Sequence, residues 1–116
     1  MKHLKKNRKF GRKTDQRRAF LKSLSANLIL REKIKTTEAR AKELRSKVER
    51  MITYAKKGTL AGQRLVKQNL PENAAKKLIR EIAPRFQQTK GGYTRITKIG
   101  RRLSDGAKMA FIEFVK

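Results

Sequence analysis

The chain has 116 residues, which fits one domain, and no cysteine, which excludes disulfides and thiolate metal sites. Its formal net charge is +24, from 33 Lys and Arg against 9 Asp and Glu, a surplus far above what solubility requires. No apolar run approaches the ~20 residues of a membrane-spanning helix, and the basic N-terminus has no apolar segment behind it, as a secretory signal would.

Residues 1–13 form a basic segment with seven Lys and Arg and no acidic residue. Only Leu4 and Phe10 are large and apolar, so the segment has little to bury. We expect a basic, extended N-terminal arm that orders on an anionic partner, followed by a single globular domain over 14–116. The 103 residues after the arm still carry +17, so the body is basic too.

The first helix is predicted over residues 14–32, with Thr14 as its cap. Large apolar residues recur at spacings of three and four and predict one buried face. The members of this face are Phe20, Leu21, Leu24 and Leu28. Arg17, Arg18 and Lys22 lie away from most of that face, so we expect them to be available to a partner.

Residues 33–37 are short and β-prone, which predicts a brief strand. The clearest helix follows, opened by Thr37 with Glu38 in its first turn and ended by Gly58 in a left-handed conformation. Its apolar stripe is Ala41, Leu44, Val48, Met51, Ile52 and Ala55.

A weaker helix is predicted over 59–70, with Thr59 as its candidate cap and Gly62 as an unfavourable residue. Another follows over 72–83, and Pro84 is expected to close it. The apolar face of that helix is Ala75, Leu78, Ile79 and Ile82.

In the C-terminal third the sequence pattern changes from that of helices to that of strands. Residues 93–99 and 108–115 are rich in β-branched and aromatic residues and flank a turn-like segment over 100–107. They predict a hairpin with a loop longer than two residues, whose second strand also pairs with 33–37. The expected fold class is therefore α+β: a small mixed sheet, made of the short strand and the C-terminal hairpin, with about four helices packed on one face in two layers.

A charge of this size points to a polyanion, and nucleic acid is the first choice because Lys and Arg release counterions from phosphates. A thin basic arm beside a small domain suits structured RNA, whose narrow groove admits no helix. A solvated basic surface and a membrane surface are the other interpretations. A membrane surface favours a long amphipathic helix with Trp or Phe on its apolar side; Trp is absent, and the predicted helices have apolar stripes suited to a protein core. The candidate RNA-binding residues are Lys2, His3, Lys5, Lys6, Arg8, Lys9, Arg12, Lys13, Arg17, Arg18, Lys22, Arg101 and Arg102.

An enzyme is not expected. His3 is the only histidine and lies in the arm, where a general base has no rigid support. The acidic residues form no recognisable metal or catalytic pattern, so we expect no metal, no cofactor and no small-molecule substrate. The alternative function is DNA binding, by a helix-turn-helix or nucleoid-type protein, although the join at 57–59 leads into a weak helix.

Five segments resemble a known family, in chain order: MKHLKKNRKFGRKTDQRRAFLKSL, IKTTEARAKELR, ITYAKKG, IAPRF and GRRLSDGAKMAFIEFV. The family is that of ribosomal protein seventeen of the bacterial large subunit. The resemblance implies a structural protein that binds large-subunit ribosomal RNA on the outer side of the subunit, toward the peptide exit, beside neighbouring ribosomal proteins. It also implies an α/β fold and no catalytic role. With no apolar span and no secretory signal, we expect no membrane partner and a cytoplasmic location, in the ribosome.

Several residues match the family by position. These are Lys2, His3, Lys9, Gly11, Arg12, Arg17, Leu21 and Leu24. The chain departs from the family at Gln16, where His is usual, at Ser23, where Asn is usual, and at Asn7, where Gly is common. Single RNA contacts at these three positions are therefore in question, whereas the resemblance itself is not.

Overall fold

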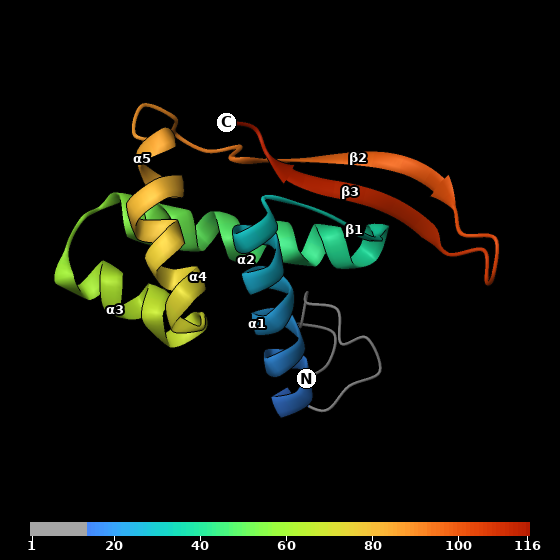
Figure 1. Ribbon diagram of the computed structural model, residues 1–116, viewed down its shortest axis with the longest axis horizontal. Helices are drawn as coiled ribbons and strands as arrows, with labels where there is room; N and C mark the ends of the chain where they lie inside the picture. The colour runs from blue at the N-terminus through green and yellow to red at the C-terminus, as the bar shows by residue number, and fades with distance from the viewer. Residues whose placement is uncertain (1–13) are drawn as a thin grey trace, which may run out of the picture.

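The computed structural model describes residues 14–116 (Figure 1). The elements in chain order are α1 (Thr14–Arg31), β1 (Lys33–Thr37), α2 (Glu38–Lys56), α3 (Leu60–Asn69), α4 (Glu72–Lys77), η2 (Leu78–Ile82), α5 (Ala83–Arg85), β2 (Thr94–Arg101) and β3 (Lys108–Phe114). Segments α4, η2 and α5 are continuous and form one helix, so residues 14–116 contain four helices and three strands.

The three strands form one sheet in the order β1-β3-β2. The α+β class and the pairing of β3 with both other strands are confirmed. The sheet is antiparallel at both pairings rather than mixed, because β3 runs opposite to its hairpin partner β2 and also opposite to β1. Helix α2 packs along all three strands, and the hairpin projects beyond its end (Figure 1).

Helix α2 is the centre of the core. The hydroxyl of Thr37 accepts a hydrogen bond from the Arg40 backbone N–H at 3.3 Å, and Gly58 follows the helix with φ +65°. The predicted stripe of six apolar residues from Ala41 to Ala55 is buried at every position. Strands and helices from both ends of the chain pack against this stripe, so α2 holds the sheet and the other helices together.

The buried face of α1 differs from the predicted one. Only Leu28 of the four expected residues is buried; Ser25, Ala26 and Ile29 are buried with it. Phe20, Leu21 and Leu24 are half-buried. The N-terminal half of α1 projects away from the sheet and from α4, so its apolar residues lack the second layer that covers the C-terminal half (Figure 1).

Gly62 allows α3 to approach α2 closely. Thr59 caps α3 by accepting a hydrogen bond from the Gly62 backbone N–H at 3.0 Å, as expected. A Cβ at Gly62 would lie 2.4 Å from the carbonyl oxygen of Tyr54 and 3.1 Å from the hydroxyl of Thr59. The glycine that weakens the helix prediction is therefore required by packing.

Replacing Gly62 with Ala should lower the free energy of unfolding by about 1–3 kcal/mol, because the added methyl group meets backbone that cannot move alone. Helix propensity acts in the opposite direction by about 1 kcal/mol. Urea denaturation of the wild type and of Gly62→Ala measures the difference. Ala61→Gly, at the exposed neighbouring position, gives the propensity effect alone, and a Gly62→Ala protein more stable than the wild type would contradict the close approach.

Pro84 does not end its helix at once. The helix widens into the π-helical turn η2 just before it, where the Ala83 N–H donates to the Leu78 carbonyl five residues back. Pro84 lacks an N–H and its ring clashes with the carbonyl four residues back, and a π turn relieves that crowding. The helix then continues to Arg85, and Phe86 packs into the core beside Tyr93, with ring centroids 5.2 Å apart.

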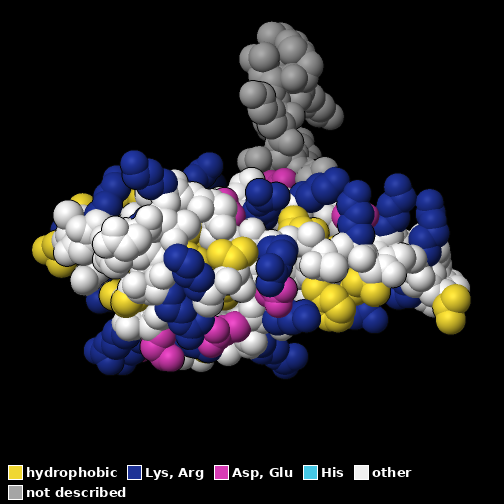
Figure 2. All heavy atoms as spheres, turned by 90° about the horizontal axis from the view of Figure 1, so that it is seen from above, with side chains coloured by type: hydrophobic (Ala, Val, Ile, Leu, Met, Phe, Trp, Pro, Cys, Tyr) yellow, Lys and Arg dark blue, Asp and Glu magenta, His cyan; other side chains and the backbone are white. Residues whose placement is uncertain are grey.

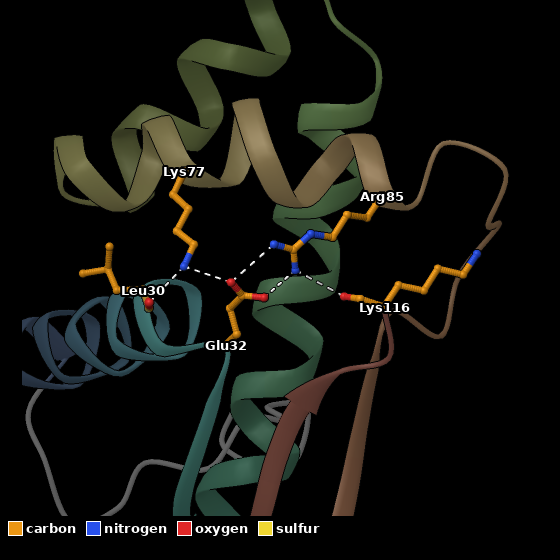
Figure 3. Close-up of polar contacts among 5 residues, drawn as sticks. All are labelled: Leu30, Glu32, Lys77, Arg85 and Lys116. Atoms are coloured by element: carbon orange, nitrogen blue, oxygen red, sulfur yellow. Dashed lines mark hydrogen bonds and ion pairs between the residues drawn. The ribbon is translucent and has the colours of Figure 1, made fainter.

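Glu32 joins both ends of the fold at the corner between α1 and β1 (Figure 3). Its φ of +67° is costly for a residue with a side chain. Its carboxylate accepts hydrogen bonds from the Arg85 guanidinium and pairs with the Lys77 ammonium at 3.1 Å. Lys77 also donates to the Leu30 carbonyl, and Arg85 to the carbonyl of Lys116. The hydrogen bond from Arg85, followed by that from Lys77, lowers the pKa of Glu32 to about 2.

Because the pKa of Glu32 is lowered, the free energy of unfolding should depend on pH. A carboxyl whose pKa is depressed in the folded state stabilises the fold above its unfolded value, near 4.5, and that contribution is lost as the pH falls toward 2. Glu32→Gln should therefore cost about 1–2 kcal/mol at pH 7, reduced from the full shift because the site is partly exposed. The variant should also lose less stability than the wild type between pH 5 and 2.

Thermal melts across this pH range check the prediction. Glu72→Gln is the matched control, because Glu72 pairs with Lys76 on an open helix surface, where a single ion pair contributes little. Identical pH profiles for Glu32→Gln and the wild type would show that the Glu32 network contributes nothing to the fold.

Candidate nucleic-acid interface

The candidate residues fall into three places along the chain. The eight in the arm, Lys2, His3, Lys5, Lys6, Arg8, Lys9, Arg12 and Lys13, lie outside the described residues. Arg17, Arg18 and Lys22 lie on the projecting half of α1. Arg101 and Arg102 lie at the far end of the hairpin, where β2 ends.

Helices α1, α2 and α3 enclose a basic groove, which we call the α1–α2–α3 groove. It is open to solvent and has a volume of about 390 Å³. Its lining residues are Arg18, Leu21, Glu43, Ser46, Lys47, Arg50, Met51, Tyr54, Leu65 and Asn69. Arg18 lines the groove from α1, and Lys47 and Arg50 line it from α2. Lys22, one turn after Arg18, lies near enough to Lys47 for the two positive charges to interact.

Lys47 is the half-buried member of this group. Burial lowers the pKa of its ammonium, and the positive charges of Lys22 and Arg18 lower it further. Glu43, one turn before Lys47 on α2, is the acidic side chain among the lining residues, against the three cations Arg18, Lys47 and Arg50. The groove therefore gathers positive charges that repel one another, and an anion in it would relieve the repulsion.

Lys47 and Arg50 are site residues that the sequence prediction does not include. They flank the buried stripe of α2, one position before Val48 and Met51, on the side that faces α1. The sequence contains part of the signal, because Lys47 and Arg50 are three residues apart and so lie on the same side of the helix. Which flank of α2 faces α1 depends on the packing of the two helices, which periodicity does not define.

The hairpin tip presents one cation more freely than the other. Arg102 binds Asp105 through two hydrogen bonds, at 3.0 and 2.7 Å, and this contact, followed by the Ala107 backbone N–H, lowers the pKa of Asp105 to about 2. Arg101 donates one hydrogen bond to the Gly106 carbonyl at 3.0 Å. The charge of Arg102 is thus balanced within the turn, whereas Arg101 retains donors for a partner.

Cations cover the rest of the surface with few acids among them. Figure 2 shows Lys and Arg side chains spread over the face that it presents, with few Asp and Glu among them. Glu32, Glu38, Glu49, Glu72, Asp105 and Glu113 are each paired with one or two cations. The surplus charge is therefore spread over the body, and the α1–α2–α3 groove is one place where it gathers.

Metal-ligating side chains do not cluster in residues 14–116. This part of the chain contains no group of three or more His, Cys, Asp or Glu side chains placed to hold a metal ion. Within the same range, no helix has the length and apolar character needed to cross a bilayer.

Fold and surface together define a class: a small, strongly basic α+β protein with a cationic groove. Residues 20–115 match the family model of ribosomal protein L17. The chain is 50% identical to the large ribosomal subunit protein bL17 of Methylacidiphilum infernorum, over 100% of this chain and 89% of that protein. Identity to the proteins of the same name is 48% in Staphylococcus epidermidis and 49% in Shouchella clausii, covering 93% and 92% of this chain and 98% and 97% of those proteins.

The chain belongs to the ribosomal protein L17 family. It is a structural constituent of the bacterial large ribosomal subunit, acts in translation and is not an enzyme. The cytoplasmic location expected from the sequence follows from this membership, because the ribosome is where the family acts.

Proposed function

We propose that the protein binds large-subunit ribosomal RNA directly and stabilises its folded form, with the basic arm over residues 1–13 and the α1–α2–α3 groove as the main contacts. The observation that supports this most is the excess of cations in the groove, where Arg18, Lys47 and Arg50 outnumber the acidic Glu43 and where Lys22 and Arg18 act on the Lys47 ammonium. Such a cluster destabilises the free protein slightly and becomes favourable once phosphate enters.

The groove suits an RNA backbone by its chemistry. Arginine can donate two parallel hydrogen bonds to one phosphate, whereas lysine acts as a movable point charge. Arg18 and Arg50 are exposed at the rim, and Lys47 is half-buried below them. A phosphate held there would contact both helices at once, which positions α1 against the RNA.

DNA recognition by α3 is less compatible with the structure. This helix carries only Arg64 and Lys67 as cations and buries Gly62 against α2. A recognition helix needs a free face with several side chains that reach base edges. Competition between a ribosomal RNA fragment and duplex DNA at ~150 mM salt tests the two, since non-specific attraction to phosphate is weak there. We expect the RNA to win; equal competition would favour a nucleoid-type function.

Full-length variants test where the RNA binds. Arg18→Ala, Lys22→Ala and Lys47→Ala combined should weaken binding and reduce the salt slope by up to about one for each phosphate that the variant no longer binds. The same is expected when Lys5, Lys6, Arg8 and Lys9 are replaced by alanine. Arg101→Ala should have a smaller effect, and Arg102→Ala a smaller one still, because Asp105 already holds that guanidinium.

The matched control removes three exposed cations outside the groove, Lys57, Lys67 and Lys90, and so makes the same change in net charge. If this control and the groove variant lose the same affinity, binding depends on overall charge and the groove is no specific contact.

A further inference from the structure

The face of the sheet that points away from α2 carries an aromatic ring among cations. Alternate residues of a strand lie on the same face. The register places Lys35 and Thr97 on either side of Phe111, whereas Ile112 lies on the opposite, core-facing side with Ile34 and Ile96. The next row on the outer face is Lys33, Glu113 and Arg95.

Beside Phe111, a hollow of about 440 Å³ lies between β1, the hairpin and its tip. It is lined chiefly by Lys35, Ile99, Gly100, Arg101, Leu103 and Met109. The pairing of β2 with β3 is irregular between Lys98 and Gly100, and Gly100 has φ +122°, which leaves Ile99 45% exposed. Figure 2 shows hydrophobic side chains gathered on the half of the molecule where the sheet lies, with Lys and Arg around them.

The charge of this outer face is positive. Its acidic residue, Glu113, already pairs with Arg95 at 2.9 Å and with Lys33 at 3.8 Å. Lys35 and Arg101 form no ion pair with a carboxylate of residues 14–116 in the contacts described. An anionic partner therefore complements this face better than a neutral or basic one.

Phe111 holds a cation that can be exchanged. The Lys33 ammonium lies 4.5 Å from the centroid of the Phe111 ring, a cation–π contact, and the Lys33 side chain is 53% exposed. A base that stacks on the ring would take the place of this ammonium. The Lys33 ammonium would then bind the phosphate of the same nucleotide, and this ion pair would replace its cation–π contact with Phe111.

We propose that this outer sheet face binds unpaired nucleotides of RNA, with one base stacked on Phe111 and a neighbouring base in the hollow beside Ile99. The flanking phosphates lie against Lys33, Lys35 and Arg101. The inference rests on the proposed RNA binding and adds its chemistry: an aromatic ring on the outer face of a sheet is a platform for bases that are not paired, because a duplex hides the faces of its bases.

Phe111→Leu tests the stacking, because leucine keeps an apolar side chain on the strand and removes the ring. The probes are a poly(U) oligonucleotide and an RNA duplex of equal length, at one fixed salt concentration. We expect Phe111→Leu to lose about 5- to 150-fold in affinity for poly(U), the effect of one stacked base, and to keep its affinity for the duplex. Phe111→Tyr should retain the wild-type affinity for poly(U).

Phe20→Leu is the matched control, because Phe20 on α1 also lies beside a cation, with the Arg40 guanidinium 4.9 Å from its ring. A poly(U) affinity of Phe111→Leu equal to the wild type would overturn the inference and leave the RNA-binding function intact. Failure of the wild type to bind either RNA would overturn the function itself.

Ultraviolet cross-linking of the wild-type protein to poly(U), read by mass spectrometry, needs no variant and decides the matter if Phe111→Leu does not fold. A uridine adduct on Phe111 supports the inference, and adducts confined to other residues overturn it. Normal poly(U) binding by Phe111→Leu together with its loss from washed large subunits would identify a neighbouring protein as the partner of this face, and would likewise overturn the inference.

Discussion

Raising the salt concentration from 50 to 200 mM should weaken binding of this protein to large-subunit ribosomal RNA by about 10³–10⁵-fold, if six to ten phosphates are contacted. The physical reason is counterion release, since each phosphate that a Lys or Arg neutralises frees condensed cations, and added salt opposes their release. The net charge of +17 on residues 14–116, and seven more positive charges before them, supplies enough cations for this number.

Filter binding or fluorescence anisotropy at four or five salt concentrations gives the slope of log affinity against log salt. The slope reports the number of phosphates contacted, and the groove variant of Arg18, Lys22 and Lys47 should lower it by up to about three. A nearly flat response would mean that shape and stacking, and not charge, hold the RNA.

The parts of the fold that the sequence predicts best are those where one period decides burial. All six residues of the α2 stripe are buried, because the sheet and the other helices pack against this helix along its length. The apolar period of its sequence therefore matches the pattern of burial. The caps at Thr37 and Thr59 were predictable for a related reason: a hydroxyl at a helix N-terminus binds a backbone N–H of its own first turn. Local contacts of this kind need no knowledge of the tertiary structure.

Contacts between distant segments could not be predicted. Apolar residues recur at helical spacing in α1 from Phe20 onward, yet the fully buried residues of the helix begin at Ser25. The spacing of residues within one helix does not show where the elements that cover it end. Glu32, Lys77 and Arg85 carry no local signal of their network, since they are brought together from three separate elements. The position of Lys47 near Arg18 and Lys22 could not be predicted either, because it depends on how α2 packs against α1.

The α1–α2–α3 groove shows how the two kinds of information combine. The amount of charge, and its presence on α1, followed from composition and helical spacing. The local concentration of charge followed only from the packing of α1 against α2, which puts a half-buried ammonium beside two other cations. A free protein that keeps such a site bears a small cost in stability, and the cost is recovered when an anion occupies the groove.

A carboxylate at the centre of α2 should prevent folding. Val48 is fully buried, between Leu44 on one turn and Met51 and Ile52 on the next. In Val48→Asp the charge would have no partner, because no polar side chain of residues 14–116 is buried there to meet it. We expect a loss of more than about 4 kcal/mol, which is comparable to the whole stability of many small domains.

Two controls separate charge from size in this experiment. Ala39→Asp adds the same charge at an exposed position of the same helix, outside the groove, and should change stability by less than about 0.5 kcal/mol. Val48→Ala removes volume without charge and should cost less than Val48→Asp, because a small apolar cavity is cheaper than an unpaired carboxylate. Circular dichroism should show no cooperative melt for Val48→Asp, and a melt equal to that of the wild type would mean that α2 turns a different face to the sheet.

The same variant should also lose specific RNA binding. Helix α2 contacts the sheet and the other helices, so its unfolding would disrupt the α1–α2–α3 groove. Val48→Asp should therefore keep only a weak, charge-driven attraction to RNA, which added salt removes.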